Sequence, residues 1–335
     1  MPCPREQREA LEQVIIGPHG VPSAQSRGRQ TPEEPCPLRT CFQRDIDRIT
    51  HSKAFRRLKH KTQVFLRPEG DHYRTRLTHT LEVSRLARTI SRALMLNEDL
   101  TEAIALGHDL GHTPFGHAGE RALAAIYEGT GFRHYEQSLR VVDRLERDGR
   151  GLNLCAETRI GILNHTNGLP RDTLEADVVR LSDRVAYVNH DLDDAVRGGI
   201  VLPEDVPEIV RRRIGERNSV RINSILQDVI ENSRDGHLSM SPEMEAAFQT
   251  FHTFMFQAVY HNPVAKAEEQ KVEGILRAIW NYYVQHIGEL PALFRAVAET
   301  DGPERAVCDY ISGMTDGYAM EVYDRLFIPA SWSIK

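Results

Sequence analysis

The sequence lacks the features that mark several common protein classes. Its 335 residues contain no uninterrupted apolar stretch that approaches the roughly twenty residues of a membrane span. Alternating apolar runs are few, and no Asn-Gly or Asp-Gly turn is flanked by β-branched runs, so strands are not predicted. Neither a phosphate-binding P-loop nor a Gly-x-Gly-x-x-Gly fingerprint is present, which argues against a P-loop kinase or a dehydrogenase.

Cysteine is scarce, and the number of cysteines is odd. The five cysteines are scattered, which fits free thiols in a reducing cytoplasm better than a disulfide framework. Cys36 and Cys41 could form half of a zinc site, but no second half follows. We therefore expect a cytoplasmic protein without structural disulfides.

Among the patterns that the sequence does contain, the helical spacing of apolar residues dominates. Apolar residues recur at spacings of three and four in 78–96, 177–196, 248–259 and 272–279. A hydrophobic content of 40% is ample for a large core. These patterns predict an all-α fold, a helical bundle with a C-terminal helical extension.

Three segments are expected to differ from this bundle. Residues 1–16 read as a short charged helix rather than a signal peptide, because they lack a continuous apolar stretch. Residues 17–37 are rich in Gly, Pro, Ser and Gln and are expected to form a loop or to be partly disordered. Residues 201–216 read as an exposed crossing between helices.

The most informative pattern is the doublet His108–Asp109, which follows an apolar helical run. Unpaired carboxylates are costly in apolar surroundings unless they are paired or bind a metal. His112 and His117 follow within a turn or two. This density of ionisable and metal-binding groups indicates a site for chemistry.

Helical phase suggests partners for the doublet. His79 lies on the apolar face of the 78–96 helix, where a lone histidine is more often a hydrogen-bonded core residue than a ligand. Asp183 belongs to a polar stripe of the 177–196 helix, which is either a solvated face or the wall of a site. Two imidazoles and two carboxylates suit one divalent ion of borderline hardness, such as Mg, Mn, Fe, Co or Ni, and do not suggest thiolate-bound zinc. Such an ion can polarise a phosphate and activate a bound water.

The order of these residues resembles the HD phosphohydrolase superfamily, and the flanking sequence resembles the bacterial deoxyguanosine triphosphate triphosphohydrolase-like proteins. The matching stretches are residues 26–29, 42–48, 54–58, 61–65, 74–79, 107–120, 136–140, 182–187, 190–194 and 309–316. The resemblance implies an HD phosphohydrolase core at 38–200, after an N-terminal segment at 1–37. A C-terminal helical part at 201–335 would pack on this core as one domain.

The resemblance also implies an activity. Members of this kind split a deoxynucleoside triphosphate (dNTP) at the 5′ oxygen into deoxynucleoside and inorganic tripolyphosphate. The metal ligands would be His79, His108, Asp109 and Asp183, and the catalytic residues His117, Glu120 and His134. His117 and Glu120 are one helical turn apart, which fits a carboxylate that orients a proton-donating imidazole; a surface pair is the plainer alternative.

Further residues would bind the substrate. Arg76 and Arg184 resemble residues that bind the polyphosphate, and His112 would face the α-phosphate unless its role is purely structural. Tyr187 would stack on the deoxyribose and crowd a 2′-hydroxyl, while Asp191 would accept from the 3′-hydroxyl. Gln63 matches a residue near the sugar and base, and its amide does not fix a base preference.

A basic tract runs from Arg39 to Arg76, with eleven Lys or Arg against four Asp or Glu, in a chain whose net charge is −6. It predicts a cationic funnel for the triphosphate or for an effector phosphate. A solvated face with paired charges, such as Asp45–Arg48, is the alternative. Single-stranded DNA is a third ligand that some relatives bind, although the overall acidity argues against strong constitutive nucleic-acid binding.

Some positions depart from the family pattern. Arg133 and Tyr135 stand where relatives commonly show an acid and an asparagine, and Gly317 replaces a residue that is often basic. The preferred base is therefore open. Relatives form dimers and hexamers, so a homo-oligomer is expected. The alternatives to a dNTP triphosphohydrolase are a nucleotidase or phosphodiesterase of the same superfamily, or a nucleotide-sensing regulator with a vestigial site.

Overall fold

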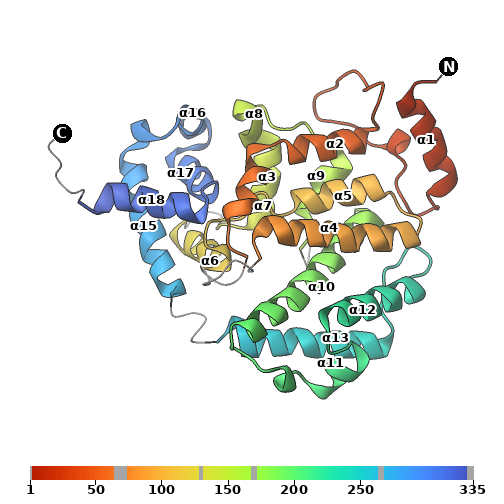
Figure 1. Ribbon diagram of the computed structural model, residues 1–335. Helices are drawn as coiled ribbons and strands as arrows, with labels where there is room; N and C mark the ends of the chain where they lie inside the picture. Colours follow the sequence, from red (N-terminus) through yellow and green to blue (C-terminus); the bar gives the residue numbers. More distant parts are fainter. Residues whose placement is uncertain (1, 64–73, 128–130, 167–171, 263–267, 330–335) are drawn as a thin grey trace, which may run out of the picture.

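The computed structural model describes residues 2–63, 74–127, 131–166, 172–262 and 268–329 (Figure 1). Within these ranges the chain is helical, and its only β-type pairings are three isolated bridges, Arg29–Cys155, Thr62–Thr75 and Arg234–His237. The predicted all-α class is confirmed. None of the helices in these ranges is both long enough and apolar enough to cross a bilayer.

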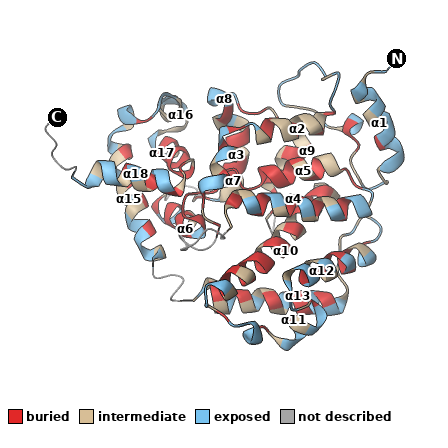
Figure 2. Cartoon of the chain, in the orientation of Figure 1, coloured by how far each residue is buried: buried red, intermediate tan, exposed pale blue. Residues whose placement is uncertain are grey.

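Three helices form the centre of the molecule: α4 (Arg76–Ala93), α5 (Glu98–Gly107) and α10 (Leu174–Arg197). The two long helices expected at 78–96 and 177–196 are thus confirmed, with ends shifted by a few residues. Asn97 caps α5 by accepting hydrogen bonds from the backbone of Asp99 and Leu100, which fixes where that helix begins. α4 packs against both α5 and α10, and the facing side chains are buried, as the red ribbon of α5 and α10 shows in Figure 2.

Short helices surround this centre, and two of them, α6 and α7, carry the predicted catalytic residues His117, Glu120 and His134. They are α2 (Cys41–Thr50), α3 (Lys53–Arg57), η2 (Leu58–His60), α6 (Gly116–Ile126), α7 (His134–Arg140), η3 (Val141–Leu145), α8 (Glu146–Gly149) and α9 (Ala156–Leu163). α2 and α9 both pack on α5.

The next group of helices extends the central core. It comprises η4 (Pro203–Asp205), α11 (Glu208–Arg213), α12 (Asn218–Asn232), α13 (Pro242–Met255) and η5 (Phe256–Tyr260). The expectation of an exposed crossing at 201–216 holds only in part: the segment connects α10 to α12 and most of it is exposed, but Val206, Val210 and Ile214 are buried in the core that α10, α12 and α13 share. Most of the charged residues between them are exposed, and these residues are the reason why the sequence predicts an exposed segment.

The C-terminal helices build a separate apolar cluster. These are α15 (Glu269–Gln285), η6 (Ile287–Glu289), α16 (Ala292–Asp301), α17 (Pro303–Ser312) and α18 (Asp316–Phe327), at the opposite end of the molecule from α1 in Figure 1. Leu276, Ile279 and Ile311 pack there with Leu123 of α6. The C-terminal helices therefore support α6.

The N-terminal helix α1 (Pro4–Ile15) confirms the charged helix predicted there. The segment from 17 to 37 is a loop, with one short turn η1 (Ser23–Gln25), but it is ordered rather than partly disordered. Arg27 pairs with Glu157 at 3.0 Å, and Arg29 pairs with the buried Asp45 at 2.5 Å. These ion pairs to distant residues fix the loop, which its composition could not reveal. The division into three parts remains a prediction.

Candidate active site

The four predicted metal ligands come together from three helices. His79 lies in the first turns of α4, His108 and Asp109 follow the end of α5, and Asp183 lies within α10. The Nε2 atom of His79 is 3.0 Å from Oδ1 of Asp183, and Nε2 of His108 is 3.7 Å from Asp109 and 3.8 Å from Asp183. Ligand atoms of His79, His108 and Asp109 all lie within 4.8 Å of one another.

The chemistry of this cluster fits a cation. Nδ1 of His108 lies 2.7 Å from the carbonyl oxygen of Ala105, which can only accept, so the free lone pair of the neutral ring is on Nε2. That Nε2 atom is buried and has no hydrogen-bond partner among the described residues. A buried lone pair beside two carboxylates is what a divalent ion would satisfy.

Both carboxylates are held in the ionised form. Burial alone would raise the pKa of Asp109, but the positive charge of Arg76 and the neighbouring imidazoles hold it well below its usual value. Burial also opposes ionisation of Asp183, yet the hydrogen bond from His79 lowers its pKa to about 2. The cluster thus carries the negative charge that a cation needs.

A cavity of about 530 Å³ opens beside this cluster. This volume lies in the range of small-molecule sites, about 300 to 1,000 Å³. The described residues that line it are Gln63, Arg76, His79, Asp109, His112, His117, Glu120, Arg121, Ala124, Phe132, His134, Asp183, Tyr187, Asp191, Phe256, Val259, Tyr260, His261 and Glu269.

Glu120 lies between the two histidines that were predicted to act with it. Its Oε1 atom is 2.8 Å from Nδ1 of His134, and its Oε2 atom is 3.6 Å from Nδ1 of His117. Burial would raise the pKa of Glu120, but these histidines hold it well below its usual value. By distance, the contact between Glu120 and His134 is the closer of the two. His117, whose side chain is 56% exposed, remains free to meet a ligand.

The loop that carries His112 and leads into α6, where His117 lies, is fixed by residues far away in sequence. The buried Lys61 donates to the carbonyl oxygens of His112 and Ser312, and Asp316 accepts from the backbone N–H of Phe115 at 2.8 Å. Phe115 has a left-handed backbone with φ of 63°, an uncommon conformation for a bulky residue that these contacts hold in place. The C-terminal helices thus position a wall of the cavity.

The turn that carries His108 and Asp109 also packs closely against α7. A Cβ atom at Gly111 would lie 2.1 Å from the backbone nitrogen of Ser138, so only glycine fits. The Ser138 hydroxyl donates to the carbonyl oxygen of His108 at 2.6 Å and accepts from Gly111. α7, whose first residue is His134, is therefore docked through Ser138 on the turn that carries the doublet.

Most predicted substrate contacts line the cavity. Gln63, Tyr187 and Asp191 do so directly, and Oδ2 of Asp191 accepts a hydrogen bond from Tyr260 at 2.5 Å. Burial raises the pKa of Asp191 to about 7, although the Tyr260 hydroxyl lowers it in part. His112 is buried under the cavity, where burial and the charge of Arg76 hold its pKa well below its usual value.

The two arginines that were predicted to bind the polyphosphate differ in their position relative to the cavity. Arg76 lies at the cavity, but its Nη1 atom donates to Asp109 at 2.6 Å, and its side chain is almost fully buried. Arg184 is absent from the described lining, because its guanidinium packs over the ring of Phe248 with its carbon 5.4 Å from the ring centre. As the structure stands, a polyphosphate contact by Arg184 would require a different side-chain orientation.

Sequence reasoning missed several lining or neighbouring residues. His165, after α9, is buried with Nε2 only 3.1 Å from Nε2 of His134, and burial together with His108 and His134 lowers its pKa to about 3. Tyr260 and Phe256 reach the cavity from η5. The position of His165 after an apolar helical run, like that of His108, is a signal that could have found it.

The basic tract does not form a funnel among the described residues. Of its cationic side chains in these ranges, Arg76 is the one that lines the cavity. Several others are paired elsewhere: Arg39 with Asp47, Lys53 with Asp148, and Arg74 with Glu82 and Asp194. The suggested pair Asp45–Arg48 is wrong, because Arg48 pairs with Glu33 while Asp45 pairs with Arg29. Residues 64–73, which include Arg67 of the tract and the end of the 61–65 match, lie outside the described residues.

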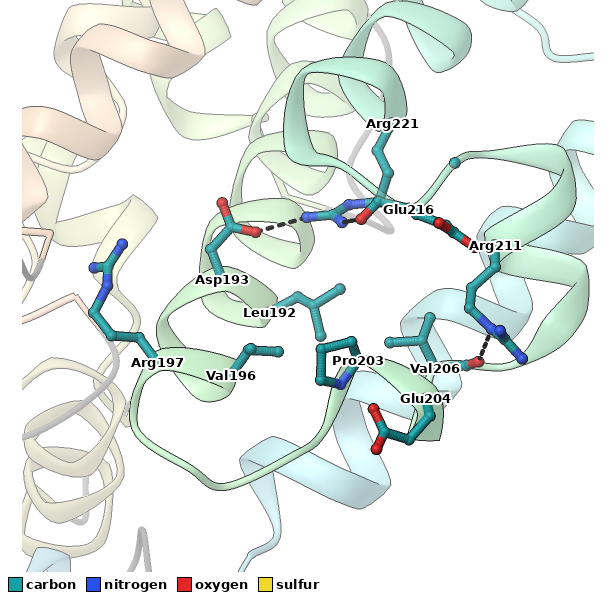
Figure 3. A pocket seen from close by; sticks show the side chains of 11 residues that line it. Leu192, Asp193, Val196, Arg197, Pro203, Glu204, Val206, Arg211, Glu216 and Arg221 are labelled. Atoms are coloured by element: carbon teal, nitrogen blue, oxygen red, sulfur yellow. Dashed lines mark hydrogen bonds and ion pairs between the residues drawn. The ribbon is translucent and has the colours of Figure 1, made fainter.

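A second cavity, of about 480 Å³, lies between the end of α10 and the α11–α12 region (Figure 3). Two of its arginines are already bonded: Arg221 pairs with Asp193 at 2.8 Å and donates to the carbonyl oxygen of Glu216 at 2.7 Å. Arg211 likewise donates to the carbonyl oxygen of Val206 at 3.0 Å. With its arginines satisfied internally, this cavity is the weaker candidate for chemistry.

The four candidate metal ligands lie within a segment that matches the model of a known domain. The HD domain model matches residues 76–188, and the phosphohydrolase-associated domain model matches residues 238–325. A deoxyguanosinetriphosphate triphosphohydrolase-like protein of Caldanaerobacter subterraneus subsp. tengcongensis is 54% identical over 329 residues, covering 98% of this chain and 97% of the relative.

Proteins with the same description from Desulfatibacillum aliphaticivorans and Clostridium perfringens are 48% and 47% identical, and each match covers 97% of this chain and 98% of the relative. With identity of this level over nearly its whole length, the chain belongs to the family of deoxyguanosinetriphosphate triphosphohydrolase-like HD-domain proteins.

Proposed function

We propose that the protein hydrolyses dNTPs, in a metal-dependent reaction, to deoxynucleoside and inorganic tripolyphosphate. The observation that carries the proposal is that His79, Asp109 and Asp183 line the same cavity as His117, Glu120, Tyr187 and Asp191. A cation site, a proton donor and a sugar-binding pair would then act on one ligand. The names of the relatives point to the same substrate class.

His79, His108, Asp109 and Asp183 would hold one divalent ion, drawn from Mg, Mn, Fe, Co and Ni. Such an ion would polarise the α-phosphate and lower the pKa of a bound water. Arg76 keeps Asp109 ionised and oriented, since it donates to the oxygen Oδ2 at 2.6 Å. His117 would donate a proton to the leaving 5′ oxygen, and Glu120 would orient it.

At the other part of the cavity, Tyr187 and Asp191 would recognise the sugar. Tyr187 and Tyr260 lie with ring centres 6.4 Å apart, and the Tyr260 hydroxyl holds one oxygen of Asp191. The second Asp191 oxygen would accept from the 3′-hydroxyl, while the Tyr187 ring would crowd a 2′-hydroxyl. Gln63 and His112 would face the nucleotide, and Arg184 would reach the polyphosphate after turning away from Phe248.

The test is a kinetic survey of the purified protein with each of the four dNTPs, alone and in mixtures, with Mn²⁺ or Mg²⁺. Separation by ion exchange should give tripolyphosphate and deoxynucleoside. Activation in mixtures, or by single-stranded DNA, would identify an effector, and gel filtration would show whether a dimer or hexamer forms. The cytoplasmic location expected from the free cysteines is part of the same proposal.

Two other outcomes would redirect the assignment. Pyrophosphate with nucleoside monophosphate, or turnover of monophosphates or diesters only, would indicate a different HD phosphohydrolase. Nucleotide binding without turnover under all metals would indicate a regulator with a vestigial site. The ionised carboxylates and the Glu120–His134 contact favour an active enzyme over that regulator.

A further inference from the structure

Three cysteines line a third cavity, of about 510 Å³. None of the described residues that line this cavity also lines the candidate active site. Cys36 comes from the N-terminal loop, Cys41 is the first residue of α2, and Cys155 directly precedes α9. Three of the five thiols of the chain therefore share one cavity, although they come from different segments.

Two of these thiols are in direct contact. The Cys155 thiol is hydrogen-bonded to that of Cys41, and this bond together with burial raises the pKa of Cys155. Cys155 is 0% exposed, whereas Cys41 is only partly buried and donates to the carbonyl oxygen of Ser23 at 3.4 Å. Because the sulfurs of a disulfide lie about 2.0 Å apart, two thiols in contact need only a small movement to form one.

A buried ion pair holds the backbone of both cysteines. Nη2 of Arg29 donates to the carbonyl oxygen of Cys41 at 2.9 Å, and Nη1 of Arg29 pairs with Oδ1 of Asp45 at 2.5 Å. Oδ2 of Asp45 accepts from the backbone N–H of Cys155 at 2.9 Å. The contact between the two thiols is therefore fixed from both sides by the same pair of charged residues.

Cys36 has the properties of a reactive thiol. Its sulfur accepts hydrogen bonds from the backbone N–H groups of Leu38 and Arg39 and from the side chain of Arg44, and these donors lower the pKa of Cys36 to about 7. A thiol with that pKa is roughly half ionised at neutral pH, and the thiolate is the form that a peroxide oxidises. The side chain is partly exposed, so an oxidant can reach it.

We propose that this cavity is an oxidation site, in which hydrogen peroxide reacts first at Cys36 and the stable product is a reversible disulfide between Cys41 and Cys155. Disulfides of this kind in a reducing cytoplasm are transient and sense the redox state, unlike the structural disulfides of secreted proteins. The inference goes beyond the hydrolysis of a phosphate ester and does not depend on it.

The oxidation proceeds in three steps. The Cys36 thiolate attacks one peroxide oxygen, so that an S–O bond forms, the O–O bond breaks and hydroxide leaves. The Cys41 thiol then attacks the sulfur of Cys36; an S–S bond forms, the S–O bond breaks, and the departing hydroxide takes the Cys41 proton as water. Finally Cys155 attacks the sulfur of Cys41, Cys36 leaves as the thiolate, and the Cys155 proton joins the first hydroxide. Two thiols are thus oxidised, and one peroxide is reduced to two waters.

The new bond would connect two helices that flank the same partner. α2 and α9 both pack on α5, and the bond would join the first residue of α2 to the residue before α9. A cross-link between residues so far apart in sequence restricts the unfolded chain. The oxidised protein should therefore unfold at a higher urea concentration than the reduced protein.

Peptide mapping gives the test. The reduced full-length protein is treated with hydrogen peroxide at pH 7, alkylated and analysed by mass spectrometry. The wild type should lose two hydrogen atoms and yield a peptide pair that joins Cys41 to Cys155, and a thiol reductant should reverse both changes. Cys36→Ser should form the same bond about tenfold more slowly, because an ordinary thiol is much less ionised.

Two further variants complete the test. Cys155→Ser should accumulate a Cys36–Cys41 disulfide, whereas the control Cys3→Ser, whose cysteine is not among the described lining residues, should behave as the wild type. If Cys155→Ser misfolds, the wild-type map and the rate in Cys36→Ser decide. Oxidation confined to Cys36 in the wild type, without a cross-link, would overturn the proposal, as would equal rates in the wild type and in Cys36→Ser.

Discussion

Arg76 donates from Nη1 to Oδ2 of Asp109 across 2.6 Å, and both side chains are almost completely buried. The resemblance predicts that Arg76 binds phosphate; in the structure Arg76 lines the cavity and is also bonded to a candidate metal ligand. Nη2 of the same guanidinium is 3.4 Å from the backbone oxygen of Gln63. The arginine therefore connects the candidate cation site to Gln63, which also lines the cavity.

Replacing Arg76 by Lys should weaken metal binding. A lysine cannot reproduce the guanidinium fork, so Asp109 loses its fixed partner and the carboxylate is less firmly ionised. Changes of this kind typically cost about 10- to 100-fold in metal affinity or activity. Titration calorimetry with Mn²⁺ measures the effect, and Arg85→Lys, exposed on the same helix, serves as the control. Unchanged Mn²⁺ affinity in Arg76→Lys would show that the ion pair does not support the site.

His117→Asn should lower kcat by about 10²- to 10⁴-fold, because the leaving 5′ oxygen loses its proton donor. KM and metal content should stay close to the wild-type values, since His117 is half exposed and is not one of the four candidate metal ligands. Steady-state kinetics with each dNTP provides the measurement.

A matched substrate sharpens this test of His117. A nitrophenyl ester of triphosphate has a leaving group that needs no proton, so its turnover should fall far less in His117→Asn. Equal losses for the ester and for dNTPs would assign His117 a role in binding rather than in proton transfer. His286→Asn, at the exposed end of α15, is the neutral control.

Asp191 should make stability depend on pH. Burial raises its pKa to about 7 in the folded protein, so between its ordinary pKa and pH 7 the folded state binds the proton more tightly than the unfolded state. Its contribution is therefore fully present at acidic pH and is lost as pH rises through 7. Relative to the wild type, Asp191→Asn should gain about 2 to 3 kcal/mol in free energy of unfolding between pH 5 and pH 8. Urea denaturation at the two pH values measures this, and a difference that does not change with pH would contradict it.

Asp316→Asn should loosen the loop that contains Phe115 and leads into α6, where His117 lies. An asparagine amide turns a donor toward the N–H of Phe115 or toward Thr62, which now both donate to the carboxylate. The buried donors lose partners, which costs about 1 to 3 kcal/mol. A displaced His117 should also lower kcat about 10- to 100-fold. Asp324→Asn, exposed on the same helix α18, should change neither quantity; a normal kcat in Asp316→Asn would separate the C-terminal helices from catalysis.

Tyr187→Ala should relax discrimination between deoxyribose and ribose. Removal of the ring makes room for a 2′-hydroxyl, so the ratio of kcat/KM for dGTP over GTP should fall about tenfold or more. Tyr187→Phe keeps the ring and should retain the discrimination. An unchanged ratio in the alanine variant would place the sugar elsewhere in the cavity.

The sequence was sufficient to predict the features that depend on local residue patterns. The helices α4 and α10 follow from apolar spacing, and the doublet His108–Asp109 stands out because it ends a buried helical run. Contacts between distant segments could not be read in this way. The pairing of His165 with His134, the hydroxyl of Tyr260 on Asp191, and the ion pairs that order residues 17–37 all depend on the packing of separate helices. The sequence could not show side-chain direction either: Arg184, next to the candidate ligand Asp183, packs on Phe248.

The most direct measurement of the central claim is hydrolysis of dGTP by the Mn²⁺-loaded protein in water labelled with heavy oxygen, with mass spectrometry of both products. Attack at the α-phosphorus predicts one labelled oxygen in tripolyphosphate, unlabelled deoxyguanosine, and no turnover in Asp183→Asn. Label in a nucleoside monophosphate or in pyrophosphate, or turnover that survives the loss of Asp183, would contradict the account.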